Sequence, residues 1–387
     1  MLSSELITDP RSLDSLESEW DALAVACRLP LMTPAWVMSW WRHVAPTNAK
    51  LRSIAVRDGD ELIGLVPFYV TAGRWQRVDY RLPGIELAAR LSPLAARGRE
   101  WDVAASTAHL LAGCRPRPDA IALEGAPVAS QWPAALRNRW PGLTRPVVRQ
   151  YLVQGAPTIS LREPSYEEWL AGKSANFRGQ MRRLRRQFAA AGGTVRVCTQ
   201  ETAHADIAAF MRLHAGRWEG RGGSGIVAAG DRLSAMLEAV AQTHAGNGRL
   251  RLWMLEIENE PISAQLFIAA GGEVAYVNGG WDERFAHLKP AMLGILHAIE
   301  DAFARGEGRV DLGGGEQSYK LRFADGNDPV AWTIVMLPGS RLPLTQLRTM
   351  PMLISHSLRG AAKRTLTPEH ADRLRSARQR LRSLCAR

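Results

Sequence analysis

The sequence predicts a mixed α+β protein built from two similar units and a basic helical tail. Each half of the 387-residue chain begins with segments of helical periodicity and continues with alternating hairpin strands. The halves also align weakly at an offset of 199 residues without gaps, at Leu51-Arg52 with Leu250-Arg251, Ile63 with Ile262, and Phe68 with Phe267. Because the chain is too long for one ordinary core, we expect units at 1–156 and 157–340 and a tail at 341–387.

The first unit is predicted to contain two helical segments followed by a hairpin. Leu13, Leu16, Trp20 and Leu23 recur at helical spacing, and Thr33-Pro34 is typical of a helix start. Asp58-Gly59 between two apolar runs predicts a hairpin turn. The weaker predictions are strands near 120–123 and 151–154 and a helix near 131–140.

The second unit is predicted to hold helices first and then a β-β-β-α-β succession. Phe177, Met181, Leu184 and Phe188 form one apolar seam on an otherwise arginine-rich helix at 176–191. Gly271-Gly272 predicts a tight hairpin turn. The other expected elements are helices near 207–218, 233–240 and from 290, and strands at 159–161, 250–258, 262–270, 273–278, 309–312 and 330–337.

Composition restricts the class of protein. Hydrophobic residues make up 46% and charged residues 22% of the chain, as in folded globular proteins. No run of 18 or more apolar residues predicts a membrane span, and the first residues lack a secretory pattern. The four cysteines have neither metal-binding nor redox spacing. We therefore expect a cytoplasmic protein with free thiols and no metal.

The positive charge is concentrated in the tail. The net charge is +11, and residues 341–387 hold eleven Lys/Arg against Glu369 and Asp372, which leaves only +2 for the rest. A basic appendage indicates an anionic partner rather than a nucleic-acid-binding fold. Leu344, Leu347, Met350 and Leu353 are followed by a basic helix predicted at 369–384. Three roles remain open for this tail: lying on an anionic membrane surface at the inner face, binding a nucleotide, or packing on the body.

The most informative stretch runs from Asp311 to Phe323, with the sequence Asp-Leu-Gly-Gly-Gly-Glu-Gln-Ser-Tyr-Lys-Leu-Arg-Phe. Glycines accept positive φ and allow close approach to the backbone. A carboxylate, a phenol and an ammonium follow them at Glu316, Tyr319 and Lys320. This combination after a strand predicts a site, in which Asp311 fixes the turn by accepting backbone N–H groups.

This stretch resembles the Asp-Leu-Gly turn followed by Tyr-Lys of GNAT acyltransferases, in their tandem FemAB-like or CelD-like branch. The other matching segments are Asn176–Phe188, Leu213–Trp218, Asn278-Gly279-Gly280, the helix from Pro290 and Leu65-Val66-Pro67-Phe68. The resemblance covers about residues 15–337 and implies two GNAT-like domains, the first of them degenerate. Residues 286–293 depart from the family, because they lack its Gln/Arg-x-x-Gly-x-Gly phosphate loop.

The resemblance implies acyl transfer from acetyl-CoA or another acyl-CoA. Lys320 would stabilise charge at the reacting acyl group, Tyr319 would protonate the leaving thiolate, and Glu316 would act as base or bind substrate. The ordinary alternatives are a lysine paired with Asp311, a tyrosine packed in the core, and a solvated loop carboxylate.

The carrier is expected at the helix start at 290, where free N–H groups and the helix dipole attract phosphate. The cofactor-binding candidates are His287, Lys289, Pro290, Ala291 and Gly313. The ordinary alternative is a plain helix start with a solvated lysine.

The acceptor is expected near a second group of residues, whose members are Asp311, Asn278, Arg217, Trp218 and Arg178. Arg217 and Trp218 precede the glycine-rich loop at 220–225, and Arg178 begins the arginine face of its helix. Core packing of Trp218 and a solvated basic helix face are the ordinary alternatives.

The leading hypothesis is a GNAT-type N- or O-acetyltransferase acting on a small-molecule or carbohydrate acceptor of envelope or exopolysaccharide biosynthesis. A second hypothesis keeps the fold and takes aminoacyl-tRNA as the donor, as the FemAB ligases do. A third is a non-catalytic module that binds an anionic ligand or a membrane through the tail.

Overall fold

The computed structural model describes residues 1–72, 77–87, 90–218 and 225–365. It is a mixed α/β structure, as the sequence predicts, with three sheets. The described strands of the first unit and the strand that joins them from the far end of the chain are β1 (Leu2–Ile7), β2 (Lys50–Leu51), β3 (Ser53–Asp58), β4 (Glu61–Val66), β5 (Tyr69–Ala72), β6 (Val78–Arg81), β7 (Leu94–Ala95), β8 (Ala120–Pro127), β9 (Val147–Gln154) and β17 (Val330–Met336).

Helices cover these strands in the first unit. They are α1 (Pro10–Asp14), α2 (Glu17–Ala26), the short 3₁₀ helix η1 (Pro30–Met32), α3 (Pro34–His43), α4 (Glu100–Gly113) and α5 (Trp132–Arg139). Two sheets have the orders β1-β3-β4-β7 and β2-β5-β6-β8-β17-β9. Strands β6 and β8 pair in parallel, and α4 lies in the connection between them. The helical spacing of Leu13, Leu16, Trp20 and Leu23 predicts one helix over 12–27, but the structure divides this stretch into α1 and α2.

The second unit contains one seven-stranded sheet. Its strands are β10 (Pro157–Ser160), β11 (Gly193–Val197), β12 (Leu250–Ile257), β13 (Glu260–Ala270), β14 (Glu273–Trp281), β15 (Arg309–Asp311) and β16 (Gly326–Asn327). Its helices are α6 (Tyr166–Ala171), α7 (Ala175–Ala190), α8 (Ala203–Trp218), α9 (Gly225–His244), the 3₁₀ helix η3 (Glu283–Leu288), α10 (Pro290–Ala304) and α11 (Ser318–Phe323). The strand order is β11-β12-β13-β14-β15-β10-β16, in which only β14 and β15 pair in parallel.

The two faces of this sheet are covered by different helices because side chains alternate along each strand. In β13, Leu266 and Ile268 pack with the residues of α8 and α9, whereas Phe267 and Ala269 pack with those of α7 and α10. The seam predicted on α7 is buried as expected. The predicted Gly271-Gly272 turn joins β13 to β14, and both glycines have positive φ.

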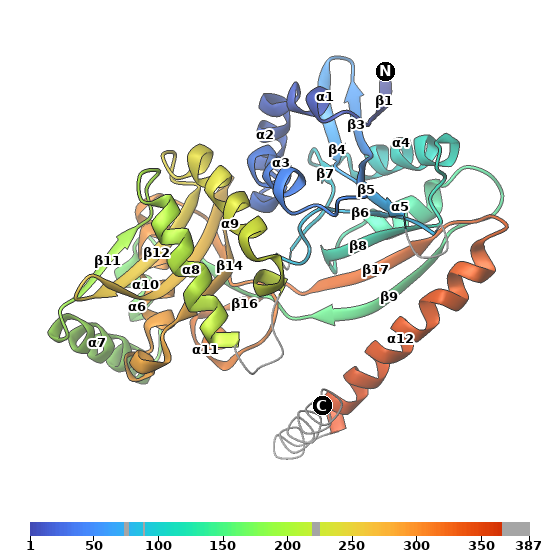
Figure 1. The fold of residues 1–387 in the computed structure, drawn as a ribbon. Coiled ribbons are helices and arrows are strands. Elements are labelled where there is room, and N and C mark those ends of the chain that lie inside the picture. The colour runs from blue at the N-terminus through green and yellow to red at the C-terminus, as the bar shows by residue number, and fades with distance from the viewer. Residues whose placement is uncertain (73–76, 88–89, 219–224, 366–387) are drawn as a thin grey trace, which may run out of the picture.

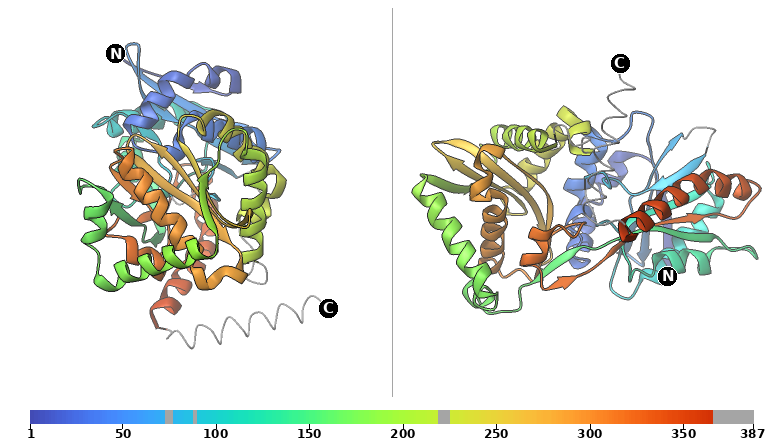
Figure 2. Two further views of the ribbon diagram at one scale, coloured as in Figure 1. Left: turned by 90° about the vertical axis from the view of Figure 1, so that its left-hand side faces the viewer. Right: turned by 90° about the horizontal axis from the view of Figure 1, so that it is seen from below.

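The two units share one core. Helix α3 of the first unit packs on α9 of the second, and the largest apolar cluster runs through both. Figure 1 shows the units side by side, with β9 and β17 reaching from one toward the other. Two further views appear in Figure 2.

The sequence-based placement of the last strand in the second unit is wrong. Strand β17 pairs antiparallel with β8 on one side and β9 on the other, so it completes a sheet of the first unit. An apolar strand can be buried in any sheet that has a free edge. The residues of β17 therefore do not specify which sheet it joins. The division at 156/157 remains a proposal, now with β17 crossing it.

Helix α8 approaches β14 so closely that only glycine fits at position 280. A Cβ atom on Gly280 would lie 2.4 Å from the backbone nitrogen of His214 and 2.5 Å from the carbonyl carbon of Leu213. We predict that Gly280→Ala lowers the unfolding free energy by more than about 2 kcal/mol, because backbone atoms must separate. Urea unfolding measures this loss. Gly179→Ala is the control: its Cβ meets nothing within 4 Å, and alanine favours the helix. Equal stability of the two variants would contradict the close contact.

The tail begins with α12 (Leu342–Thr365), which directly follows β17. Its first turns contact β9 and β17. The basic helix predicted at 369–384 lies outside the described residues. Within the described part of the chain, no helix is long and apolar enough to cross a membrane.

Candidate active site

The candidate site lies where two parallel strands separate. Strand β15 pairs with β14 only from Glu273 to Ala275 and then ends at Asp311, whereas β14 continues to Trp281. The pairing of β14 with β13 shifts register so that Val277 is an extra, bulged residue. Bulges redirect the side chains beside them, and here the redirected segment is the part of β14 that β15 leaves uncovered.

Lys320 in α11 is the buried cation of this site. Its side chain is 5% exposed, and its Nζ donates to the carbonyl oxygens of Gly314 at 2.9 Å and Gly313 at 3.4 Å. Burial lowers the pKa of Lys320 to about 8, against the attraction of Asp311 and together with the repulsion of Arg217. A lysine with this pKa can carry charge or exchange a proton near neutral pH.

The glycine run is shaped by Asp311. The Asp311 carboxylate accepts from the backbone N–H of Gly313 at 2.8 Å, which confirms that it fixes the turn. Gly313 and Gly315 adopt positive φ, so side chains there would be strained. Asp311 forms no direct ion pair with Lys320 among the described contacts, which differs from the ordinary alternative for Lys320. The turn therefore lies between them, with its N–H facing Asp311 and its carbonyls facing Lys320.

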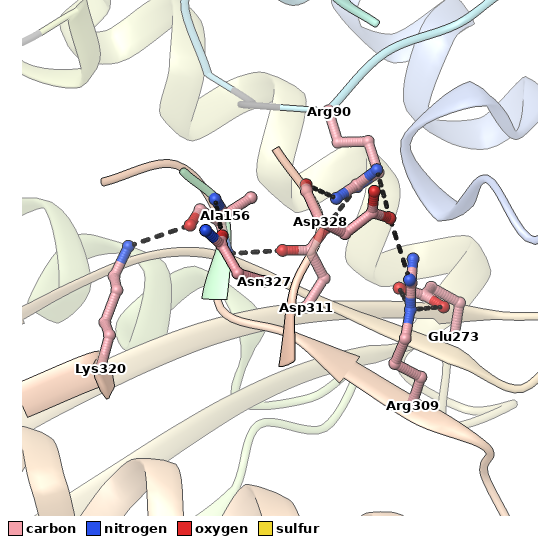
Figure 3. Close-up of polar contacts among 9 residues, drawn as sticks. Arg90, Ala156, Glu273, Arg309, Asp311, Lys320, Asn327 and Asp328 are labelled. Carbon is pink, nitrogen blue, oxygen red and sulfur yellow. Dashed lines mark hydrogen bonds and ion pairs between the residues drawn. The ribbon is translucent and has the colours of Figure 1, made fainter. Parts of the chain in front are cut away.

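Arg90 of the first unit holds Asp311 in place. The Arg90 guanidinium pairs with the Asp311 carboxylate, and the two side chains are only 9% and 3% exposed. Arg90 also pairs with Asp328, which pairs with Arg309, and Arg309 binds Glu273. Figure 3 shows this network leading from Arg90 to Asp311 and Arg309, with Lys320 at the far side of the glycine turn.

Glu273 lies at the beginning of β14 in the same network. Burial raises the pKa of Glu273 to about 7, although the Arg309 guanidinium opposes the shift. The network thus joins both parallel strands to the first unit through the buried Arg90, Asp311 and Glu273 and the half-buried Arg309 and Asp328.

Two tyrosine phenols lie at the site, and one of them is hydrogen-bonded into the sheet. Tyr276 O–H donates to Gln265 Oε1 at 2.9 Å, and the Tyr276 and Tyr319 phenols are close enough for each to influence the pKa of the other. Gln265 in turn donates to Ser263 Oγ at 2.9 Å and to the Gly280 carbonyl at 3.3 Å. Burial raises the pKa of both tyrosines, so both stay protonated at neutral pH. The Lys320 ammonium lies 5.7 Å from the centre of the Tyr276 ring.

Arg217 brings a second cation to the site from the end of α8. Its guanidinium stacks 4.0 Å from the centre of the Trp281 ring, at the end of β14. Its charge also acts on the pKa values of Lys320, Tyr319 and Tyr276. Arg217 and the Tyr319-Lys320 pair, predicted from two separate segments, therefore come together.

The remaining substrate-binding candidates have different positions. Trp218 follows Arg217 and is half-buried on the stripe of His214, its ring 6.1 Å from the imidazole ring. Asn278 on β14 accepts from its neighbour Gly279 N–H at 2.9 Å. Arg178 is used elsewhere: it donates to the carbonyls of Ala171 and Lys173 between α6 and α7.

Glu316 is exposed and lies on the other side of the glycine run. Its carboxylate accepts from Asn327 Nδ2 at 3.3 Å, and it lies close to Gly155. These contacts attach the loop to the edge of the sheet.

The predicted carrier-binding residues lie together at the beginning of α10. Lys289 is its N-cap in the left-handed conformation, Pro290 is its first residue, and His287 ends the preceding 3₁₀ helix. His287 and Lys289 are exposed. Proline there has no N–H, so Ala291 supplies the first free donor of the helix. Gly313 belongs to the separate glycine turn after β15.

A comparison with known families identifies this region. Residues 175–321 match the family model described as an acetyltransferase (GNAT) domain, and the match contains Lys320, Tyr319, Tyr276 and Arg217. Residues 175–321 are thus similar to GNAT acetyltransferase domains, and they hold most of the candidate site. No curated protein matches the chain.

Solved structures share the fold across both units. FemX is 13% identical, with a TM-score of 0.60 over 89% of this chain and 99% of its own. The C-terminal domain of a putative lysylphosphatidylglycerol synthetase from Agrobacterium fabrum is 8% identical, with a TM-score of 0.53 over 87% of this chain and 96% of that domain. L-PGS from Bacillus licheniformis is 12% identical, with a TM-score of 0.50 over 89% and 97%. The resemblance to the FemAB-like branch is confirmed at the level of fold.

Sequence reasoning missed Arg90, Tyr276 and Gln265. Arg90 lies 221 residues from Asp311 in a stretch of weak local pattern. Tyr276 and Gln265 lie on strands that were predicted correctly, and a buried glutamine at an inward position was the available signal, since such a side chain needs partners.

Proposed function

We propose that this chain transfers an acyl group from acyl-CoA to an amine or hydroxyl, with acetyl-CoA as the leading donor. The observation that carries the proposal is Lys320, buried beside the uncovered part of β14 with a pKa lowered to about 8. The leading acceptor is a sugar of envelope or exopolysaccharide biosynthesis. This choice rests on the family resemblance.

In this reaction the acceptor nitrogen or oxygen forms a bond to the acyl carbon, and the C–S bond of the thioester breaks. Lys320 and Arg217 supply positive charge to the oxyanion that develops between these events. Tyr319 supplies a proton to the leaving thiolate, and the proton that the acceptor nitrogen or oxygen loses restores the Tyr319 hydroxyl. Glu316, exposed on the neighbouring loop, would act as the base or bind the acceptor.

The carrier phosphates are assigned to the beginning of α10. The residues there fit an anion: Lys289 is exposed and cationic, His287 adjoins it, and the helix has its positive dipole end at Ala291. The proposed carrier site also includes the main-chain groups of β14 that do not pair with β15.

Aminoacyl-tRNA is the second candidate donor, because the fold likeness to FemX extends over both units. One further structural neighbour is named as a putative lysylphosphatidylglycerol synthetase, and another is named as L-PGS. The first name denotes transfer of an aminoacyl group. This alternative keeps the same cations at the reacting acyl group and replaces CoA by a longer anionic carrier. It predicts binding that weakens steeply with salt.

Calorimetric titration of acetyl-CoA tests the donor, with Lys289→Glu and its matched control Lys50→Glu. Both lysines are exposed, but Lys50 lies in β2 of the first unit. We expect micromolar binding by the wild type, a loss of at least tenfold for Lys289→Glu, and an unchanged affinity for Lys50→Glu. Release of free CoA thiol with amino-sugar acceptors then identifies the acceptor class.

Two outcomes would overturn this proposal. Absence of acetyl-CoA binding together with salt-dependent binding of aminoacyl-tRNA would assign the second donor. If Lys50→Glu weakens acetyl-CoA binding as strongly as Lys289→Glu does, the carrier does not bind at the beginning of α10.

A further inference from the structure

Among the side chains that the structure describes, the most deeply buried residues of helix α12 lie in its first two turns. Leu342 packs with the apolar cluster around Ile334 and Met336 of β17. Thr345 and Thr349 are buried one turn apart, and Thr349 Oγ donates to the Thr345 carbonyl at 2.7 Å. Figure 1 and the left view of Figure 2 show the helix leaving the first unit and extending beyond the sheets.

The outward face of α12 is apolar. Its exposed residues recur at spacings of three and four and are Leu344 (44% exposed), Leu347 (68%), Met350 (47%) and Ile354 (51%). They lie on one side of the helix, roughly opposite to Thr345 and Thr349. Ile354, rather than the predicted Leu353, continues this stripe, since Leu353 is half-buried. A contiguous row of large apolar side chains on a surface helix marks an interaction surface.

The same segment is strongly and exclusively basic. Residues 342–365 contain four Lys/Arg and no Asp or Glu, and the whole range 341–387 has a net charge of +9. In the sequence, Arg348 lies between Leu347 and Met350, two residues of the apolar row. The helix thus combines an exposed apolar row with positive charge that no carboxylate of its own neutralises.

We propose that α12 docks on the surface of an anionic lipid bilayer, with Leu344, Leu347, Met350 and Ile354 inserted between the headgroups. An anionic bilayer offers apolar depth and negative charge at the same surface, which are the two properties of this helix. A nucleic acid would match the charge but leave the apolar row in water. A second copy of the chain would cover the row but bring equal positive charge against it.

Vesicle sedimentation tests this docking with the full chain. We expect binding to phosphatidylcholine vesicles that contain roughly one third phosphatidylglycerol. Binding to vesicles of pure phosphatidylcholine should be at least about tenfold weaker. The double variant Leu347→Asp/Ile354→Asp is expected to lose binding at least tenfold. Leu347→Met/Ile354→Leu keeps the apolar row and should bind as the wild type does. Raising the salt concentration should weaken binding because charge attraction is screened.

Val128→Asp is the matched control. Val128 is 46% exposed and follows β8 at the end where β17 begins, whereas α12 follows the other end of β17. It should bind as the wild type does, and thermal unfolding of each variant verifies that it is folded. The proposal is overturned if the aspartate pair leaves vesicle binding intact. It is also overturned if the wild type is a dimer that does not bind vesicles and that the Leu347→Asp/Ile354→Asp variant dissociates. A third contrary result is that the wild type and this variant bind RNA but not vesicles.

Discussion

Lys320→Met is expected to reduce turnover about 10²–10³-fold while the folded protein keeps its stability at neutral pH. Lys320 is 5% exposed and its pKa is lowered to about 8 by burial, which means that burying its charge costs folding free energy. Methionine fills a similar volume without this cost. Steady-state kinetics and thermal unfolding of the same preparation measure both effects.

The pH dependence separates a catalytic role of Lys320 from a structural one. The folded pKa of about 8 lies below the ordinary value of 10.5, so between these values the unfolded chain binds more protons than the folded chain. Wild-type stability therefore rises with pH across that window, and the rise should be absent from Lys320→Met. If protonated Lys320 supports the reaction, kcat falls as pH rises through about 8. Lys320→Arg, which stays charged, should lose this fall.

Lys173→Met is the control for the Lys320 variants. Burial lowers the pKa of Lys173, and its Nζ donates to the Phe323 carbonyl at 2.7 Å, so this change also removes a partly buried ammonium bound to a carbonyl. Its Nζ contacts the end of α11 rather than a carbonyl of the glycine turn, so turnover should stay within about twofold of the wild type. A loss as large as that of Lys320→Met would show that charge removal near α11 is generally harmful.

Arg90→Ala is expected to lower the unfolding free energy by about 3–5 kcal/mol, because it leaves the buried Asp311 carboxylate without its cation. Arg90 and Asp311 are 9% and 3% exposed, so water cannot replace the lost partner well. Turnover should fall as well, since Arg90 is a positioning residue for the turn that Asp311 fixes and Lys320 binds. Urea unfolding and steady-state kinetics measure these losses.

A double-mutant cycle distinguishes this pair from a general effect. Arg90→Ala with Asp311→Asn should cost at least about 1 kcal/mol less than the sum of the single changes, because the second change removes the orphaned charge. Arg42→Ala breaks an exposed pair with Asp14, whose side chains are 53% and 42% exposed, and should cost less than about 1 kcal/mol. Strict additivity at Arg90 and Asp311 would argue against the coupling between the units.

The sequence by itself determined the elements whose signal lies within a few residues. The seam of α7, the Gly271-Gly272 turn and the Asp311-to-Lys320 stretch are examples. Helical period, positive φ and turn hydrogen bonds depend on neighbouring residues, so a single sequence displays them. For the same reason the role of Asp311 in accepting a backbone N–H of its turn was predicted correctly, and the structure identifies the donor as Gly313.

Only the tertiary structure decided which distant segments meet. It placed β17 between β8 and β9, set Arg90 against Asp311, and stacked Arg217 on Trp281. Strand choice depends on which sheet edges are free after collapse, and a buried ion pair depends on two surfaces closing over it. Neither is encoded in local periodicity. The candidate site therefore combines a sequence-encoded turn with partners that only the packing of the two units supplies.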